Sequence, residues 1–340
     1  MSGQILEIKK KINGIKNTRK ITKAMQLVAA SKMRQFQKRA VHARSFVWDL
    51  LKVLKNNMEG RQENIYTEAR EEGKTLFVLY TSDKGLCGSL NTKLINALFR
   101  SEKWNSLDPE DRALITIGKK SHNYAVSNKI PVLKSFVGIP EKFSTLDAIG
   151  IIDNILTLWH KDRENAIVDD AEEMEDHEEM KIKEVIFVSP HYKNSFTFYP
   201  VMKTFLPLSK ESVKDILRFA DEKFDFTFEQ EKYVNEDDED YEYKEEEPEE
   251  EIPYMLYEPD KEAILNRLYE QIIQSLFIES FLQLKASEYS SRMIAMQNAT
   301  EAADKIINNL TLAYNKARQQ AVTQEIAELI GASMAISDQE

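Results

Sequence analysis

Proline and glycine are missing from two long stretches of this 340-residue sequence, residues 15–59 and 260–330. Proline removes a backbone hydrogen-bond donor and clashes with the preceding turn, and glycine costs backbone entropy, so both tend to interrupt helices. All nine prolines lie between Pro109 and Pro259. The two stretches therefore predict two uninterrupted helices, one near each end of the sequence.

Cysteine and long apolar runs are also scarce. The single cysteine, Cys87, excludes an intrachain disulfide and a cysteine-based zinc site, and it favours a reducing compartment. No stretch approaches 18 uncharged apolar residues, as a membrane-spanning helix would need. An amphipathic pattern with interspersed lysines begins at Ile5, which resembles neither a signal peptide nor a transit peptide and favours a bacterial-type protein.

Charge is distributed very unevenly along the sequence. Residues 1–58 carry 14 lysines and arginines against 2 acidic residues, whereas residues 229–251 carry 14 acidic residues against 2 lysines. The net charge of -11 conceals this contrast. A basic first segment predicts an acidic partner, and nucleic acid, anionic lipid or a carboxylate-rich protein surface would all satisfy it.

Apolar residues within the two predicted helices recur about every 3.5 positions, which is the spacing of a coiled-coil seam. The first helix has Ile5, Ile8, Ile12, Ile15, Arg19, Thr22 and Met25 in this pattern, with Arg19 and Thr22 as imperfect members. The second has Ile264, Leu268, Ile272, Leu276, Met293, Met296, Ala303, Ile307, Leu310, Tyr314, Ala317 and Ala321. Continuous helices would span roughly 85 and 110 Å, more than a compact domain needs, so we expect an antiparallel coiled coil.

The middle of the sequence has a different pattern. Short apolar runs at residues 74–80, 113–117 and 184–188 are typical of buried parallel strands, and helical patterns lie between them at Leu90–Arg100 and Thr145–His160. A last strand pair is expected around Ser195–Leu206, at a sheet edge because Pro200 interrupts it. The predicted fold class is thus a long antiparallel coiled coil of the terminal helices with an inserted small doubly wound, Rossmann-like α/β domain.

Two acidic segments are interpreted as insertions in the predicted α/β domain. The first spans residues 162–183, and the second spans residues 226–253 and repels itself strongly enough to predict a disordered loop. The predicted domains are a coiled-coil helix over 1–60, the α/β domain over 74–225, the acidic loop over 226–253 and a second coiled-coil helix over 254–340.

Motifs that would announce catalysis are missing. The turn after the first strand, residues 81–90, has Gly85 and Gly88 but neither a dinucleotide fingerprint nor a P-loop, so both glycines are interpreted as turn formers. Cys87 has no base nearby in the sequence and is predicted to be a small buried thiol. The five histidines lack metal-ligand spacing. We expect no catalytic residue, no metal and no cofactor.

Several runs resemble one family. GIKNTRKITKAMQLVAASKMR (residues 14–34) is similar to the N-terminal signature of F-type ATP synthase gamma subunits, and residues 287–300 and 312–326 are similar to the C-terminal signature. DKGLCGSLN (residues 83–91) and LYEPD (residues 256–260) match as well. The matched runs follow the family's order from end to end.

This resemblance implies a role as the central stalk of F1Fo ATP synthase, with one copy per complex. Its implied partners are the alpha and beta subunits of the alpha3beta3 hexamer, the epsilon subunit and the c-ring, at the cytoplasmic face of the bacterial cell membrane. The chain would couple ion-driven rotation of the c-ring to ATP synthesis or hydrolysis on beta, and would have no catalytic site of its own.

The resemblance also assigns roles to residues. Those implied to meet acidic loops of beta during rotation are Lys23, Met25, Arg34 and Arg292. Polar contacts with alpha and beta near the upper end of the shaft are implied for Arg318, Gln319, Thr323 and Glu325, and contacts with the c-ring or epsilon for Tyr257 and Glu258. The small, nearly uncharged tail at residues 330–336 would turn in a hydrophobic sleeve.

Two alternatives remain from the residues alone. A basic coiled-coil scaffold or nucleic-acid-binding protein would explain the first helix, although no aromatic residue for base stacking lies between Met1 and Gln35. A degenerate nucleotide-binding α/β enzyme would explain the middle.

Overall fold

The computed structural model describes residues 2–57, 64–139, 145–160, 181–194, 197–208, 258 and 260–337. Most of the two predicted acidic insertions lies outside these residues. The chain divides into two compact units. The helical unit consists of Met1–Lys32, Leu86–Gly88 and Tyr289–Glu340, and the sheet unit consists of Met33–Gly85 and Ser89–Glu288. The domain limits predicted from the sequence stay predictions.

The sheet unit is built on five strands in the order β3-β2-β1-β4-β5. The first four are parallel, and β5 pairs antiparallel with β4 at the edge. Their bounds are β1 Lys74–Tyr80, β2 Arg112–Ile117, β3 Lys134–Phe136, β4 Ile182–Asn194 and β5 Thr197–Leu206. Since the chain winds outward from β1 to β3 and returns to the other side of β1 at β4, the sheet is doubly wound.

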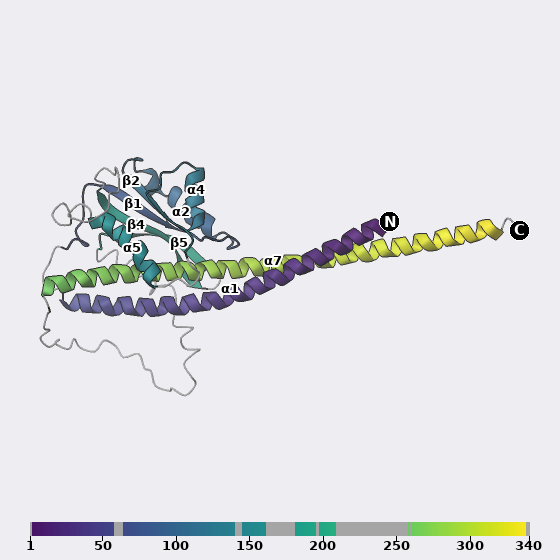
Figure 1. The fold of residues 1–340 in the computed structure, drawn as a ribbon, viewed down its shortest axis with the longest axis horizontal. Helices are drawn as coiled ribbons and strands as arrows, with labels where there is room; N and C mark the ends of the chain where they lie inside the picture. The colour runs from purple at the N-terminus through teal and green to yellow at the C-terminus, as the bar shows by residue number, and fades with distance from the viewer. Residues whose placement is uncertain are drawn as a thin grey trace, which may run out of the picture. The chain divides into compact units, whose positions relative to one another are not determined.

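Helices cover both faces of this sheet (Figure 1). The shorter ones are α2 Leu90–Phe99, α3 Glu102–Asn105, α4 Lys119–Ser127 and α5 Thr145–His160. The two long ones are α1 Ser2–Asn57 and α7 Lys261–Ser337, and each contributes residues to both units. The predicted fold class, terminal helices that flank an inserted α/β domain, is confirmed.

The predicted strand at the sheet edge is wrong in one respect. Residues 197–206 form a single strand, not a strand pair, and this strand continues through Pro200. Its partner is β4 from Val185 to Asn194, which continues beyond Val188, the last β4 residue that pairs with β1. Pro200 lies opposite Pro190 at this edge, where a proline interrupts no inner ladder.

An aromatic cluster joins the sheet to α7 within the sheet unit. The ring centroid of Tyr80, at the end of β1, lies 5.6 Å from that of Phe187 on β4 and 5.8 Å from that of Phe277 on α7. Alternation along a strand sends the neighbouring side chains to the opposite face, where Phe77 meets Trp104 of α3 at 5.0 Å. Both faces of β1 are therefore core, which matches its continuous apolar sequence.

The Tyr80 hydroxyl is buried and has no hydrogen-bond partner among the described residues. Burial raises the pKa of Tyr80 well above its ordinary value of 10. Because the unfolded chain ionises at pH 10 while the folded chain keeps the proton, stability is unaffected below pH 10 and falls as the pH rises further. We expect Tyr80→Phe to stabilise the chain by about 1 kcal/mol and to weaken this alkaline loss.

Urea unfolding at pH 8 and above pH 10 measures both effects of Tyr80→Phe. Tyr199→Phe is the matched control, because Tyr199 is an exposed tyrosine on β5. If Tyr80→Phe were no more stable than Tyr199→Phe at pH 8, the Tyr80 hydroxyl would have a partner that the structure does not reveal.

The helical unit is an antiparallel pair of helix segments. Thr22 of α1 meets Thr300 of α7 through their hydroxyl oxygens at 2.8 Å, and Arg19 Nε lies 2.5 Å from Asp304 Oδ1. Residues nearer the N-terminus of α1 therefore contact residues nearer the C-terminus of α7. The predicted antiparallel pairing is confirmed, and its buried members include Ile12, Ala29, Met296 and Ala303.

The seam differs from the sequence prediction at two residues of α1. Arg19 is exposed and forms an ion pair beside the seam, and Met25 is 40% exposed. Strict alternation of three and four residues after Thr22 leads to Gln26 and then to Ala29, which is 1% exposed. Met25 was therefore assigned to the wrong face. On α7 all the predicted stripe residues are buried or half-buried.

No helix in the described part of the chain is both long and apolar enough to cross a membrane.

Candidate functional site

The surface of the helical unit brings together several of the predicted site residues. Lys23 is exposed on α1 and donates a hydrogen bond to Oε1 of Gln26 at 3.2 Å, along its own helix. Met25 is exposed two positions further on, because the seam passes through Gln26. A basic and a polarisable side chain are thus both available to a partner that approaches α1.

Arg292 lies on α7 beside Tyr289, with its guanidinium carbon 5.2 Å from the centre of the aromatic ring. The same ring receives Lys32 of α1, whose Nζ atom lies 5.4 Å from the centroid. One aromatic ring therefore holds a cation from each helix, which cation–π attraction stabilises. Sequence reasoning missed Lys32 and Tyr289 as members of this cluster, although both lie within the two signature runs.

The other predicted residues fall elsewhere. Arg34 is exposed on α1 in the sheet unit, and Glu258 is exposed just before α7. Tyr257 lies outside the described residues. Helix α7 continues through the predicted sleeve segment, but the side chains beyond Ile330 are not described.

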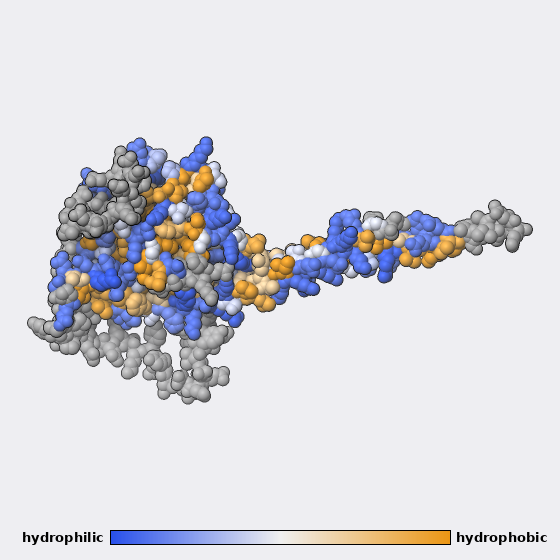
Figure 2. Space-filling view, in the orientation of Figure 1, coloured by the Kyte–Doolittle hydropathy of each residue, from blue (hydrophilic) through white to orange (hydrophobic). Residues whose placement is uncertain are grey.

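Helix α7 continues past its contacts with α1. From Val322 to Ile330 every side chain is exposed, and this stretch is named the single-helix end. It carries a run of exposed apolar side chains, namely Val322, Ile326, Leu329 and Ile330. Apolar and hydrophilic residues are interspersed along this part of α7 in Figure 2. An exposed apolar run on one helix indicates a partner surface.

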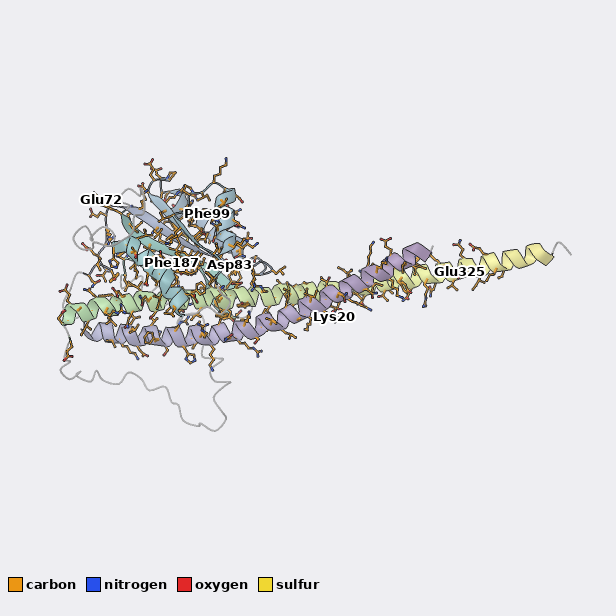
Figure 3. The ribbon with its side chains drawn as sticks, viewed as in Figure 1. Lys20, Glu72, Asp83, Phe99, Phe187 and Glu325 are labelled. Atoms are coloured by element: carbon orange, nitrogen blue, oxygen red, sulfur yellow. The ribbon has the colours of Figure 1, made fainter. Side chains whose placement is uncertain are left out.

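The four upper contact residues predicted from the sequence lie on or next to this end. Arg318, Gln319, Thr323 and Glu325 are all exposed, and Thr323 Oγ1 donates to the carbonyl of Gln319 at 2.9 Å. Glu325 projects from α7 in Figure 3. Helical spacing places Arg318 and Glu325 on one row with Val322 and Leu329, and Gln319 and Thr323 on the next row with Ile326 and Ile330. Each polar residue therefore shares its face with an apolar one.

Asp83, which is labelled in Figure 3, connects the first strand–helix turn of the sheet unit to the start of α4 and to the loop after β3. Its Oδ1 accepts from the backbone N–H groups of Lys119 at 2.9 Å and Gly138 at 3.1 Å, and its Oδ2 accepts from Ile139 at 3.0 Å. Lys119 begins α4, and helix N-termini are the usual anion sites of such folds. The chain's own carboxylate occupies that position at α4, which disfavours phosphate binding there and gives Asp83 a structural role.

We expect Asp83→Asn to lower the free energy of unfolding by about 1.5–3 kcal/mol, because the amide nitrogen cannot accept the Ile139 N–H group and the charge is lost. Chemical unfolding of the purified chain gives the difference. Asp108→Asn, at an exposed loop position, should stay within about 0.5 kcal/mol of the parent. Equal stabilities for the two variants would refute the bridging role of Asp83.

No group of three or more His, Cys, Asp or Glu side chains within the described residues is arranged to hold a metal ion. Cys87 is buried, as predicted, and its carbonyl accepts from Ser291 Oγ at 2.6 Å. His160 Nε2 lies 3.0 Å from the hydroxyl of Tyr66, which donates in turn to Glu270 at 3.1 Å in a part-buried contact between elements.

Comparison with known proteins gives a consistent result. A family model described as ATP synthase matches residues 4–336. The ATP synthase gamma chain of Picosynechococcus sp. is 30% identical over 341 residues, covering 97% of this chain and 98% of the relative.

Solved structures share the fold. The rotor of the Euglena gracilis mitochondrial ATP synthase in rotational state 1 matches with a TM-score of 0.56 at 16% identity, over 95% of this chain and 100% of that one. A chain of the OSCP/F1/c-ring structure of the same enzyme in rotational state 3 gives a TM-score of 0.60 at 16% identity, over 99% and 95%. A chain of the Tetrahymena thermophila central stalk/c-ring structure gives 0.50 at 23%, over 82% and 99%.

Proposed function

This chain belongs to the ATP synthase gamma chain family, and we propose that it is the rotating central shaft of a rotary ATP synthase. The resemblance predicted from the sequence runs is thereby confirmed. In this role the shaft couples ion-driven rotation of a c-ring to the cycling of catalytic sites on the beta subunits. The proposed surroundings are an alpha3beta3 hexamer around the shaft, with the epsilon subunit and the c-ring at its foot.

The single-helix end of α7 is the observation that best supports this role. A nine-residue exposed stretch with Val322, Ile326 and Leu329 on its surface would be a liability in an isolated soluble protein. Inside a ring of subunits this stretch could rotate against its surroundings, because apolar side chains make non-directional contacts that can be exchanged as the helix turns. The polar residues beside them, Thr323 and Glu325, would make contacts that change with each step.

Basic side chains of the two long helices supply the second part of the role. Lys23 and Arg292 of the helical unit and Arg34 of the sheet unit are suited to meeting acidic loops of beta, since long-range charge can guide an approach without a permanent bond. Met25 adds a flexible thioether at an exposed position, which suits contact with successive partners. Tyr257 and Glu258 are proposed to contact the c-ring or epsilon at the foot.

Catalysis is proposed to belong to other subunits of the complex. The chain would contribute no catalytic residue and bind no cofactor. We place the chain at the cytoplasmic face of a bacterial cell membrane, held there as part of the membrane-bound complex.

Purification of the tagged chain from its own cells tests the proposal directly. The expected result is a complex that contains alpha and beta subunits, hydrolyses ATP and rotates a probe attached to the foot of this chain. Recovery of the chain alone, with salt-sensitive binding to DNA, would favour the scaffold alternative. Nucleotide binding by the isolated chain would favour the enzyme alternative.

A further inference from the structure

A series of polar side chains links both long helices to the sheet inside the sheet unit. Nη2 of Arg44 on α1 lies 3.0 Å from Oε1 of Glu279 on α7. Gln283, one turn further along α7, donates from Nε2 to the same Oε1. The Oε1 atom of Gln283 accepts from the backbone N–H group of Tyr192 on β4 at 3.2 Å. The contacts therefore run from α1 through α7 to β4.

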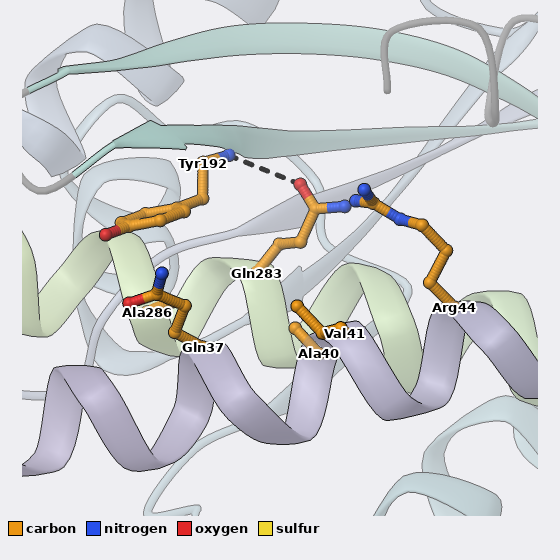
Figure 4. Close-up of a pocket in the computed structure, with 7 residues that line it drawn as sticks. All are labelled: Gln37, Ala40, Val41, Arg44, Tyr192, Gln283 and Ala286. Atoms are coloured by element: carbon orange, nitrogen blue, oxygen red, sulfur yellow. Dashed lines mark hydrogen bonds between the residues drawn. The ribbon is translucent and has the colours of Figure 1, made fainter. Parts of the chain in front are cut away.

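Figure 4 shows three of these residues, Arg44, Gln283 and Tyr192. Gln283 reaches from α7 toward the backbone of Tyr192, and Arg44 comes from α1 on the other side of the glutamine. They line a small cavity whose remaining walls are Gln37, Ala40, Val41 and Ala286. The side chains of Arg44 and Glu279 are only 15% and 6% exposed, and Gln283 and Tyr192 are buried.

A buried ion pair of this kind contributes little net stability. Removing two charges from water costs free energy that their attraction only partly offsets, and apolar side chains of similar size are often as stable or more stable. Such a pair instead fixes the position of α1 relative to α7 along the helix axis. The neighbouring seam of α1 is apolar, with Met33, Phe36, Ala40 and Val47 buried, and a heptad pattern by itself permits other axial alignments.

We propose that Arg44, Glu279 and Gln283 form a coupling lock, a set of positioning residues that makes α1 and α7 turn together with the sheet. The proposal rests on the proposed rotor function. Under torque, both helices of a shaft must move with the body that drives them. The lock holds α1 to α7 by a desolvated charge pair and α7 to β4 by a backbone hydrogen bond, so that twisting or sliding of one element against another breaks a specific buried contact.

The test uses the assembled complex with the double variant Arg44→Met and Glu279→Leu, which replaces the ion pair with apolar side chains. We expect the thermal midpoint of the complex and its ATP hydrolysis to stay at the parent's level. ATP synthesis driven by an imposed ion gradient should fall by about two- to thirtyfold, the range over which networks of this kind modulate coupling. Single-molecule angular fluctuations of a probe on the rotor should widen, because the shaft is torsionally softer.

The matched control is Lys103→Met, which removes the ion pair between Lys103 Nζ and Glu184 Oε1 at 2.6 Å. That pair joins α3 to β4 and involves neither long helix, so synthesis and angular fluctuations should match the parent. If the double variant does not assemble, Gln283→Met carries the same test, since it removes the side-chain link between α7 and β4 and the hydrogen bond to Glu279 but keeps the ion pair of Arg44 with Glu279.

The lock is refuted if the double variant, or Gln283→Met in its place, synthesises ATP and fluctuates as Lys103→Met does. It is also refuted if the loss of synthesis merely follows a lowered thermal midpoint. Both results would leave the rotor function intact. If the parent complex itself shows no rotation of this chain, the proposed function fails instead.

Discussion

Gly118→Ala should destabilise the sheet unit more than any other single methyl group considered for this chain. Gly118 lies between β2 and α4, and its φ angle is 96°. Residues with a side chain rarely adopt this backbone conformation. A Cβ atom placed there would come within 2.1 Å of the carbonyl oxygen of Thr81. Because the contact is with backbone, β1 and β2 would have to separate. Backbone strain and overpacking together predict a loss of about 4 kcal/mol or more.

Thermal unfolding of the purified chain measures this loss. A change of this size lowers the midpoint by about 10 °C or more in a domain of this length. Gly150→Ala is the matched control, because it adds the same methyl group within α5 where nothing lies within 4 Å. The control should stabilise the chain by about 0.5–1 kcal/mol through helix propensity. Similar midpoints for the two variants would contradict the close approach at Thr81.

Arg292→Gln and Met25→Gln should uncouple ion transport from ATP synthesis while leaving the fold intact. Met25 is exposed and lies off the seam, and Arg292 is half-buried over Tyr289. Neither change opens a cavity in the core, so we expect shifts of the free energy of unfolding within about 1 kcal/mol. If these side chains meet the acidic loops of beta, synthesis at a fixed ion gradient should fall roughly threefold or more.

The controls for this uncoupling test lie on the same helices. Lys305→Gln removes an exposed charge from α7, and Leu27→Gln replaces an apolar residue of α1 that is 61% exposed. Both should leave the ratio of ATP made to ions transported unchanged in the assembled complex. Coupling ratios that are the same for all four variants would show that Arg292 and Met25 have no special role in rotation.

Much of the fold was predictable because its signals are local. The absence of proline and glycine from residues 15–59 and 260–330, together with the 3.5-residue apolar repeat, predicted α1, α7 and their pairing. Continuous apolar runs marked β1, β2 and β4. Three elements were not predicted, and one of them, α3, has only four residues. Strand β3 has three residues, too few for a pattern, and α4 is a polar nine-residue helix whose first turn is positioned by Asp83 through a contact distant in sequence.

The residues of the candidate site were predicted from the sequence, and their roles remain proposals. The sequence did not predict how these residues are arranged on the surface. Signature runs pointed to Lys23, Met25 and Arg292, yet the predicted stripe placed Met25 in the seam because it took an apolar residue three positions after Thr22, where the regular alternation leads to the polar Gln26. Likewise, nothing local distinguishes the single-helix end of α7 from the paired part. Its exposure depends on where α1 begins relative to α7, which is a consequence of register.

The sequence by itself thus determined that this protein has two long helices joined through an α/β domain, and that it belongs among rotor subunits of ATP synthases. Only the tertiary structure decided which polar residues are buried together. Arg44 and Glu279 are separated by 235 positions, and each alone looks like an ordinary helical charge. Helix periodicity can be recognised from a few consecutive turns of sequence. The pairing of distant charges depends instead on the axial alignment of two helices, and the packing of the whole unit sets that alignment.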